Sequence, residues 1–155
     1  MAQAEKYAWV SLITTGIIYW YFQMRMLDGW EVVDQSPSRL LWVFGTVVAM
    51  FIIAEGVVAG FLASKGSDGE IEKDERDLDI DRRAEQNASW FTIAALNVLI
   101  FQLIAQDAFE GHSFTRFDAS STSTLFFLLF SIVIISSIVH RISTLILYRR
   151  PLRSA

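Results

Sequence analysis

Four long runs of apolar residues constrain the fold of this 155-residue chain more than any other feature. A helix needs about 20 mostly apolar residues to cross the hydrocarbon core of a bilayer, which is ~30 Å thick. The runs that approach or exceed this length are residues 7–27, 40–63, 88–105 and 125–148. Because a backbone in lipid must satisfy its own hydrogen bonds, we predict that each run is helical. The sequence therefore predicts one all-α domain over residues 1–155, an integral membrane four-helix bundle.

Lysine and arginine are distributed unevenly around these runs, and their distribution predicts the orientation of the helices. Ten of the 13 lysine and arginine residues lie before the first run, between the second and third, or towards the end of the fourth. The remaining ones are Arg25, Arg39 and Arg116. Because basic residues are retained in the cytoplasm, we expect the N-terminus and the C-terminus there. Aromatic residues are expected at both interfaces: Tyr7, Trp9, Trp90 and Tyr148 on the cytoplasmic side, and Tyr21, Trp30 and Trp42 on the outer side.

The segments between the runs differ in character. Residues 28–39 form a short outer loop, in which Pro37 is expected to break any helix. Residues 65–87 form a charged cytoplasmic loop whose second half favours helix, because Asp79 and Arg83 are one turn apart and of opposite charge. One face of such a helix carries Ile80, Ala84 and Ala88. We therefore expect the third helix to begin near Asp74 and to extend into the cytoplasm.

The charged loop has three possible interpretations, of which calcium binding is rejected. Its alternating Asp77, Asp79 and Asp81 suggest a calcium-binding loop, but such a loop needs glycine where Arg82 stands. The segment is therefore either a solvated charged helix or a docking surface for a soluble protein. The residues that would form the docking surface are Asp74, Glu75, Arg76, Asp77, Asp79 and Asp81.

A short element in this loop carries a family resemblance. The pattern D-E-R-x-x-x-I-x-x-x-A is made here by Asp74, Glu75, Arg76, Ile80 and Ala84, and it opens the third of four apolar runs. In this it resembles families of small uncharacterised bacterial membrane proteins, some of them encoded beside small helix-turn-helix regulators. The resemblance implies a multi-pass protein of the bacterial inner (plasma) membrane and suggests a small regulator as partner. It implies no activity, cofactor or binding residues.

Polar residues inside the apolar runs form the second candidate site. Each ionisable side chain inside a membrane costs ~2.5–3.5 kcal/mol on insertion scales, so such residues are expected to face the interior of the bundle. All four runs place a polar residue at a similar depth, ~13–16 Å from their cytoplasmic ends: Thr15, Glu55, Asn97, His140 and Arg141. We expect these residues to cluster, with Glu55 paired to Arg141 or His140. A helix-packing ridge beside Glu55 is formed by Gly56, Gly60 and Ser64.

Three roles are open for this cluster. It can fix the packing of the helices, or it can hold a proton or cation, since a carboxylate beside a histidine exchanges protons near neutral pH. It can also line a pocket for a small lipophilic ligand or pigment. No cofactor is expected, because no lysine lies inside a run to hold retinal and the chain has no cysteine. No metal site is expected either: in the second outer loop, His112 with Asp107 or Asp118 provides only scattered ligands.

These features favour a non-enzymatic protein, because no nucleophile, base and metal set is arranged together. We expect a membrane partner, sensor or regulator that binds another protein through its charged cytoplasmic loop. The alternative is a small oligomeric proton- or cation-coupled transporter that uses Glu55 within the membrane. Either would be embedded in the lipid bilayer as a homo-oligomer or as a subunit of a larger complex. No direct contact with nucleic acid is expected, because no segment is basic enough.

Overall fold

The computed structural model of the protein describes residues 3–63, 75–108 and 121–149, and it is almost entirely helical. Its helices are α1 (Gln3–Met26), α2 (Pro37–Ala63), α3 (Glu75–Ala108) and α4 (Thr122–Arg149). Among the described residues, α2, α3 and α4 are long and apolar enough to cross a membrane. The first helix does not qualify, because its tyrosine, tryptophan and hydroxyl side chains lower its mean hydropathy. The all-α prediction is confirmed, together with three of the predicted spans as candidates.

The helix boundaries differ from the predicted runs in one instructive place. Pro37 was expected to break a helix, yet it is the first residue of α2. Proline is well tolerated there because its missing N–H would have no partner in the first turn of a helix anyway. The preceding Ser36 starts the hydrogen-bond ladder, since its carbonyl accepts from the backbone N–H of Leu40 at 3.0 Å. The start of α3 at Glu75 agrees with the prediction of a start near Asp74, which itself lies outside the described residues.

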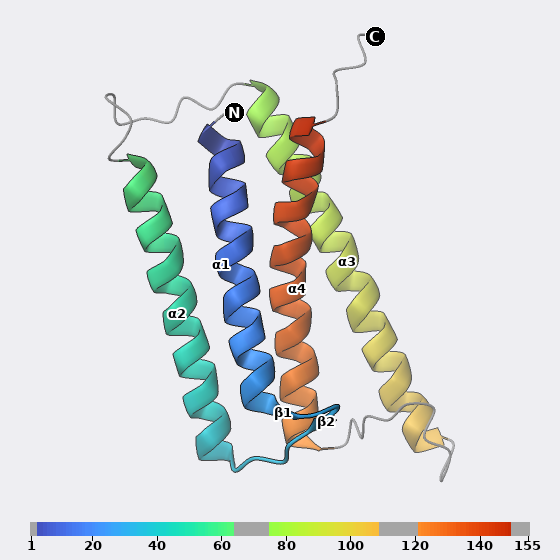
Figure 1. The fold of residues 1–155 in the computed structure, drawn as a ribbon. Helices are drawn as coiled ribbons and strands as arrows, with labels where there is room; N and C mark the ends of the chain where they lie inside the picture. The colour runs from blue at the N-terminus through green and yellow to red at the C-terminus, as the bar shows by residue number, and fades with distance from the viewer. Residues whose placement is uncertain (1–2, 64–74, 109–120, 150–155) are drawn as a thin grey trace.

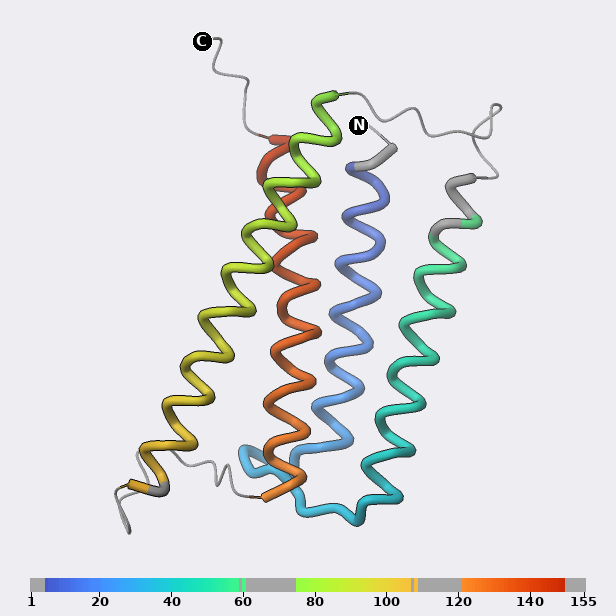
Figure 2. The backbone as a smooth tube through the Cα atoms, turned by 180° about the vertical axis from the view of Figure 1, so that it is seen from behind, coloured from blue at the N-terminus to red at the C-terminus, as the bar shows by residue number. Residues whose placement is uncertain are grey.

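The four helices lie in a row, in the spatial order α2, α1, α4, α3 (Figure 1). The first helix packs against α2 and α4, and α3 packs against α4. Towards its C-terminal end α3 diverges from α4, as the view from behind also shows (Figure 2). The predicted four-helix bundle is therefore confirmed only as four helices side by side, with α2 and α3 at opposite edges of the row. A row leaves two broad faces on which apolar side chains are not covered by the chain itself.

The two ends of this row are distinct. We call one the terminal end, where α1 and α3 begin and α2 and α4 finish (Figure 1). At the opposite, hairpin end, α1 and α2 are joined by the antiparallel strands β1 (Leu27–Asp28) and β2 (Glu31–Val32). The turn between them uses Gly29 at a φ of 63°, a conformation that glycine adopts without strain. The loop after β2 is fastened to the start of α4, because the backbone N–H of Gln35 donates to the Ser123 hydroxyl at 2.9 Å.

The apolar core lies towards the hairpin end, between α1, α2 and α4. At its centre is Phe22, which is completely buried. Its ring lies 5.6 Å from that of Phe127 and 5.1 Å from that of Phe130, measured between centroids. The other buried members of this core are Ile18, Met26, Leu40, Val43, Val47 and Ile134. These contacts hold the three helices together and fix the rotation of each about its own axis.

Candidate functional site

Glu55 is the centre of a polar cluster that joins three helices. One carboxylate oxygen, Oε1, accepts a hydrogen bond from Arg141 Nη2 at 3.0 Å and another from the Ser11 hydroxyl at 2.7 Å. The other oxygen, Oε2, accepts from the hydroxyl of Tyr7. We call Tyr7, Ser11, Glu55 and Arg141 the Glu55 cluster. Glu55 was expected to pair with Arg141 or His140; in the structure it pairs with Arg141, and α1 supplies two further donors.

Sequence reasoning missed the part that Tyr7 plays in this cluster. It assigned Tyr7 to the ring of aromatic side chains at the membrane interface. In the structure the Arg141 guanidinium also lies over the Tyr7 ring, 5.1 Å from its centroid, which is the geometry of a cation–π contact. A signal was available: Tyr7 and Ser11 are four residues apart, so they share one face of α1. That face is buried at Ser11.

The other predicted members of the intramembrane cluster lie elsewhere. His140 does not pair with Glu55; its Nε2 lies 3.3 Å from Asp81 Oδ1 on α3. Asn97 is exposed, and its side chain donates back to the carbonyl of Ile93 on its own helix. Thr15 is buried, one turn beyond Ser11. Similar depth along the helices did not predict which side chains meet. Adjacent residues of a helix point about 100° apart, so they face different neighbouring helices.

The Glu55 cluster lies towards the terminal end of the fold. Glu55 lies eight residues before the last residue of α2, which is ~12 Å along a helix about 40 Å long. Arg141 lies eight residues before the end of α4. Both positions fall in the third of the fold closest to the terminal end.

A second set of polar contacts joins α3 to α4. We call it the α3–α4 seam, and it consists of the pairs Asp77–Tyr148 at 2.7 Å, Asp81–His140 at 3.3 Å, Asn87–Ser143 at 3.3 Å and Thr92–Ser136 at 2.8 Å. The seam residues recur every three to five positions on α4 and every four to six on α3, so they lie along one side of each helix. Between the polar pairs, Ala84 is fully buried, and its small side chain lets the two helices approach closely.

The seam divides the predicted docking residues into two groups. Asp77 and Asp81 face α4 and are engaged within the chain. Glu75, Arg76 and Asp79 are exposed, and Asp79 forms the expected ion pair with Arg83 at 2.9 Å. Asp74, the remaining member, lies outside the described residues. The start of α3 is therefore not a freely solvated helix but one attached to α4 along one side.

Removing a single seam contact should loosen the start of α3. In Tyr148→Phe the carboxylate of Asp77 loses its donor, and one net hydrogen bond is worth about 0.5–1.5 kcal/mol. Hydrogen exchange of the amides in residues 75–83 should therefore become roughly three- to tenfold faster. Tyr19→Phe is the matched control, since the Tyr19 hydroxyl makes no hydrogen bond within the residues described. Unchanged exchange in Tyr148→Phe would show that the seam does not hold this segment.

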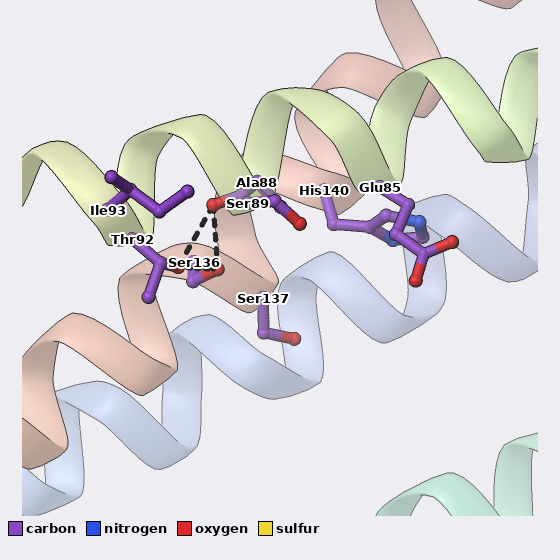
Figure 3. Close-up of a pocket in the computed structure, with 8 residues that line it drawn as sticks. All are labelled: Glu85, Ala88, Ser89, Thr92, Ile93, Ser136, Ser137 and His140. Carbon is purple, nitrogen blue, oxygen red and sulfur yellow. Dashed lines mark hydrogen bonds between the residues drawn. The ribbon is translucent and has the colours of Figure 1, made fainter.

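A hollow of about 480 Å³ lies beside the seam, between α3 and α4 (Figure 3). It is lined by Glu85, Ser89, Thr92, Ser136, Ser137 and His140, with Ala88 and Ile93. Two of the hydroxyls are already engaged: the Ser136 hydroxyl donates to the carbonyl of Ala88 at 3.2 Å, and the single proton of Thr92 is shared between that carbonyl at 2.9 Å and the Ser136 oxygen at 2.8 Å (Figure 3). Across the described residues no three histidine, aspartate or glutamate side chains converge on a possible metal position. The hollow is thus a wide groove lined by both polar and apolar side chains.

The predicted packing ridge of α2 faces away from the rest of the chain. A Cβ atom added to Gly56 or Gly60 would meet no heavy atom within 4 Å. Ser64, the third member, lies outside the described residues. Within the described part of the chain, Gly56 and Gly60 therefore pack against no second helix. The reason is the position of α2 at the edge of the row, where only one side of the helix has a neighbour.

The fold and these contacts define an all-helical protein with three helices that can cross a membrane. No protein-family model, no characterised protein and no solved structure matches the chain. Its function is therefore argued from geometry and chemistry.

Proposed function

We propose that this chain is a four-span, non-enzymatic protein of the bacterial inner membrane that binds a cytoplasmic protein through the outward face of the first turns of α3. The observation that carries the proposal is the α3–α4 seam. It supports α3 from one side while leaving a charged surface uncovered on the other. A helix that is already ordered loses little conformational entropy when a partner binds, so a supported surface favours recognition.

The exposed stripe on α1 supports a fourth span. Val10, Ile13, Ile17, Trp20 and Met24 are 47–67% exposed, and they follow one another at the three- and four-residue spacing of a helix face. The opposite face carries the buried residues Ser11, Thr15, Ile18 and Phe22. A continuous uncovered apolar stripe is unfavourable in water and favourable in lipid. In addition, α1 lies between α2 and α4, which are both candidate spans (Figure 1).

The proposed orientation of the helices in the membrane rests on the distribution of lysine and arginine. Of the eight lysine and arginine residues that the structure describes, six lie towards the terminal end of the row: Lys6, Arg76, Arg82, Arg83, Arg141 and Arg149. Because basic residues are retained in the cytoplasm, this end is assigned to the cytoplasmic side. The docking surface on α3 would then lie in the cytoplasm, within reach of soluble proteins. It contains both signs of charge and one large apolar side chain, Leu78, which is 52% exposed. An exposed leucine among charged residues suits a protein partner better than it suits a metal ion or a nucleic acid.

Site-specific photocrosslinking in membranes tests the docking surface. A photoreactive residue at Leu78 should give a discrete adduct with a cytoplasmic protein, and the pair of charge reversals Glu75→Lys and Asp79→Lys should reduce that adduct at least about fivefold. The matched control is the same photoreactive residue at Phe101, which is 72% exposed further along the same helix. Absence of an adduct at Leu78, or an adduct equally strong in the charge-reversed chain, would contradict the proposal.

Self-association belongs to the same proposal. The uncovered ridge at Gly56 and Gly60 lets another helix approach closely, which favours a homo-oligomer or a place in a larger membrane complex. No specific observation favours the alternative, a proton- or cation-coupled transporter. Glu55 accepts hydrogen bonds from three side chains, and this arrangement suits a fixed carboxylate better than one that releases and reloads its cargo.

A further inference from the structure

A second hollow, of about 210 Å³, lies near the hairpin end between α1 and α2. It is lined by Tyr21, Arg25, Arg39, Trp42, Val43 and Thr46. Arg25 is in the last turn of α1, and Arg39 is in the first turn of α2. Two arginines from consecutive helices therefore border one small space.

These two arginines have no counter-charge in the described part of the chain. The side chain of Arg39 makes no hydrogen bond or ion pair there. Arg25 donates to the hydroxyl of Tyr21 at 3.2 Å and lies 5.4 Å above the centre of its ring, so its contacts are to a neutral group. The acidic residues of the hairpin, Asp28 and Glu31, are exposed and do not line the hollow. Two like charges side by side are repulsive, and an anion between them removes the repulsion.

We propose that this hollow binds the phosphate group of a phospholipid. Guanidinium donors match phosphate oxygens in geometry and form charge-assisted hydrogen bonds with them. The hydroxyl of Thr46 is a further donor in the lining. Trp42 is 75% exposed and, like Tyr21, suits the headgroup level of a bilayer, where aromatic side chains gather.

The surface next to the hollow indicates a lipid and not a free phosphate ion. Ile17 lies one turn before Tyr21 on α1, and Ile53 lies two turns beyond Thr46 on α2, so helical periodicity puts them on the same sides as the lining residues. They are 62% and 65% exposed. An acyl chain running from the phosphate between α1 and α2 would cover both, whereas an inorganic ion would cover neither. This binding site does not depend on the docking function proposed for α3.

Native mass spectrometry of the full chain in mild detergent tests the site. We expect phosphatidylglycerol to remain bound, and a galactosyl diacylglycerol, which has two acyl chains but no phosphate, to bind at least about tenfold more weakly. The double variant Arg25→Gln with Arg39→Gln should weaken phosphatidylglycerol binding by a similar factor. The matched control changes two exposed arginines at the terminal end, Arg82→Gln with Arg83→Gln, and should leave binding unchanged.

Three results would overturn the assignment. Equal binding of both lipids would show that acyl chains alone are recognised. Unchanged binding in the double variant would show that the hollow is not the site. Displacement of phosphatidylglycerol by millimolar inorganic phosphate would show a site for a free anion. If the double variant does not fold, Arg39→Gln alone replaces it, because that side chain makes no hydrogen bond or ion pair with the described residues.

Discussion

Glu55→Ala should lower the midpoint of thermal unfolding by roughly 5–10 °C. The unfolding is measured by tryptophan fluorescence of the protein in detergent micelles. The substitution removes the carboxylate that Arg141, Tyr7 and Ser11 all donate to, and it leaves the Arg141 charge without its partner. Removing one member of a buried ion pair costs about 3–5 kcal/mol. Because Glu55 is still 37% exposed, we expect the lower half of that range.

A double variant separates an interaction effect from a general loss of packing. Glu55→Leu together with Arg141→Leu should recover most of the stability lost in Glu55→Leu alone, because no unpaired charge is then left. The coupling free energy of the two positions should reach about 1–3 kcal/mol. Asn97→Leu is the control at an exposed position and should change the stability by less than about 0.5 kcal/mol. Additive losses at Glu55 and Arg141 would mean that the ion pair contributes nothing to the fold.

Phe22→Ala should be the other strongly destabilising substitution. This ring is fully buried and touches the rings of Phe126, Phe127 and Phe130 at centroid distances of 5.1–6.0 Å. Truncating a buried phenylalanine to alanine costs about 3–5 kcal/mol, because the cavity left behind collapses only in part. The expected loss in unfolding midpoint is roughly 8–15 °C, measured in the same detergent.

The control for Phe22 is Phe101→Ala. Phe101 is 72% exposed on α3, so the surrounding solvent or lipid fills the space that its ring leaves. The free energy of unfolding of the Phe101→Ala variant should stay within about 0.5 kcal/mol of that of the parent chain. Similar losses for the two phenylalanines would contradict the assignment of the core to the region between α1, α2 and α4.

Most of the helix boundaries could be predicted from the sequence. Long apolar runs have one available conformation in lipid, and the charged stretch before the third run is rich in helix-forming residues with a common face at Ile80 and Ala84. Both residues are buried against α4 in the structure. Pro37 was misread because the same residue ends a helix when it is internal and begins one when it is in the first turn.

The candidate sites were predicted only in part. That Glu55 would pair with Arg141 or His140 followed from the high cost of isolated charges in lipid. The sequence did not predict which of the two would contact Glu55. In the structure Arg141 contacts Glu55, and His140 contacts Asp81. Two adjacent residues have the same depth and differ only in direction around the helix axis, and the axis rotation of α4 is fixed by packing at positions such as Phe127 and Ile134.

The sequence by itself determined the elements: where the chain is helical, which runs are apolar enough for lipid, and which charges need partners. Only the tertiary structure decided the neighbours: the order of the four helices in a row, a seam that engages Asp77 and Asp81, and a ridge at Gly56 and Gly60 that faces outward. The physical reason is that helix formation depends on local composition and spacing. Which faces meet depends on side-chain contacts between residues tens of positions apart, and no local pattern encodes them.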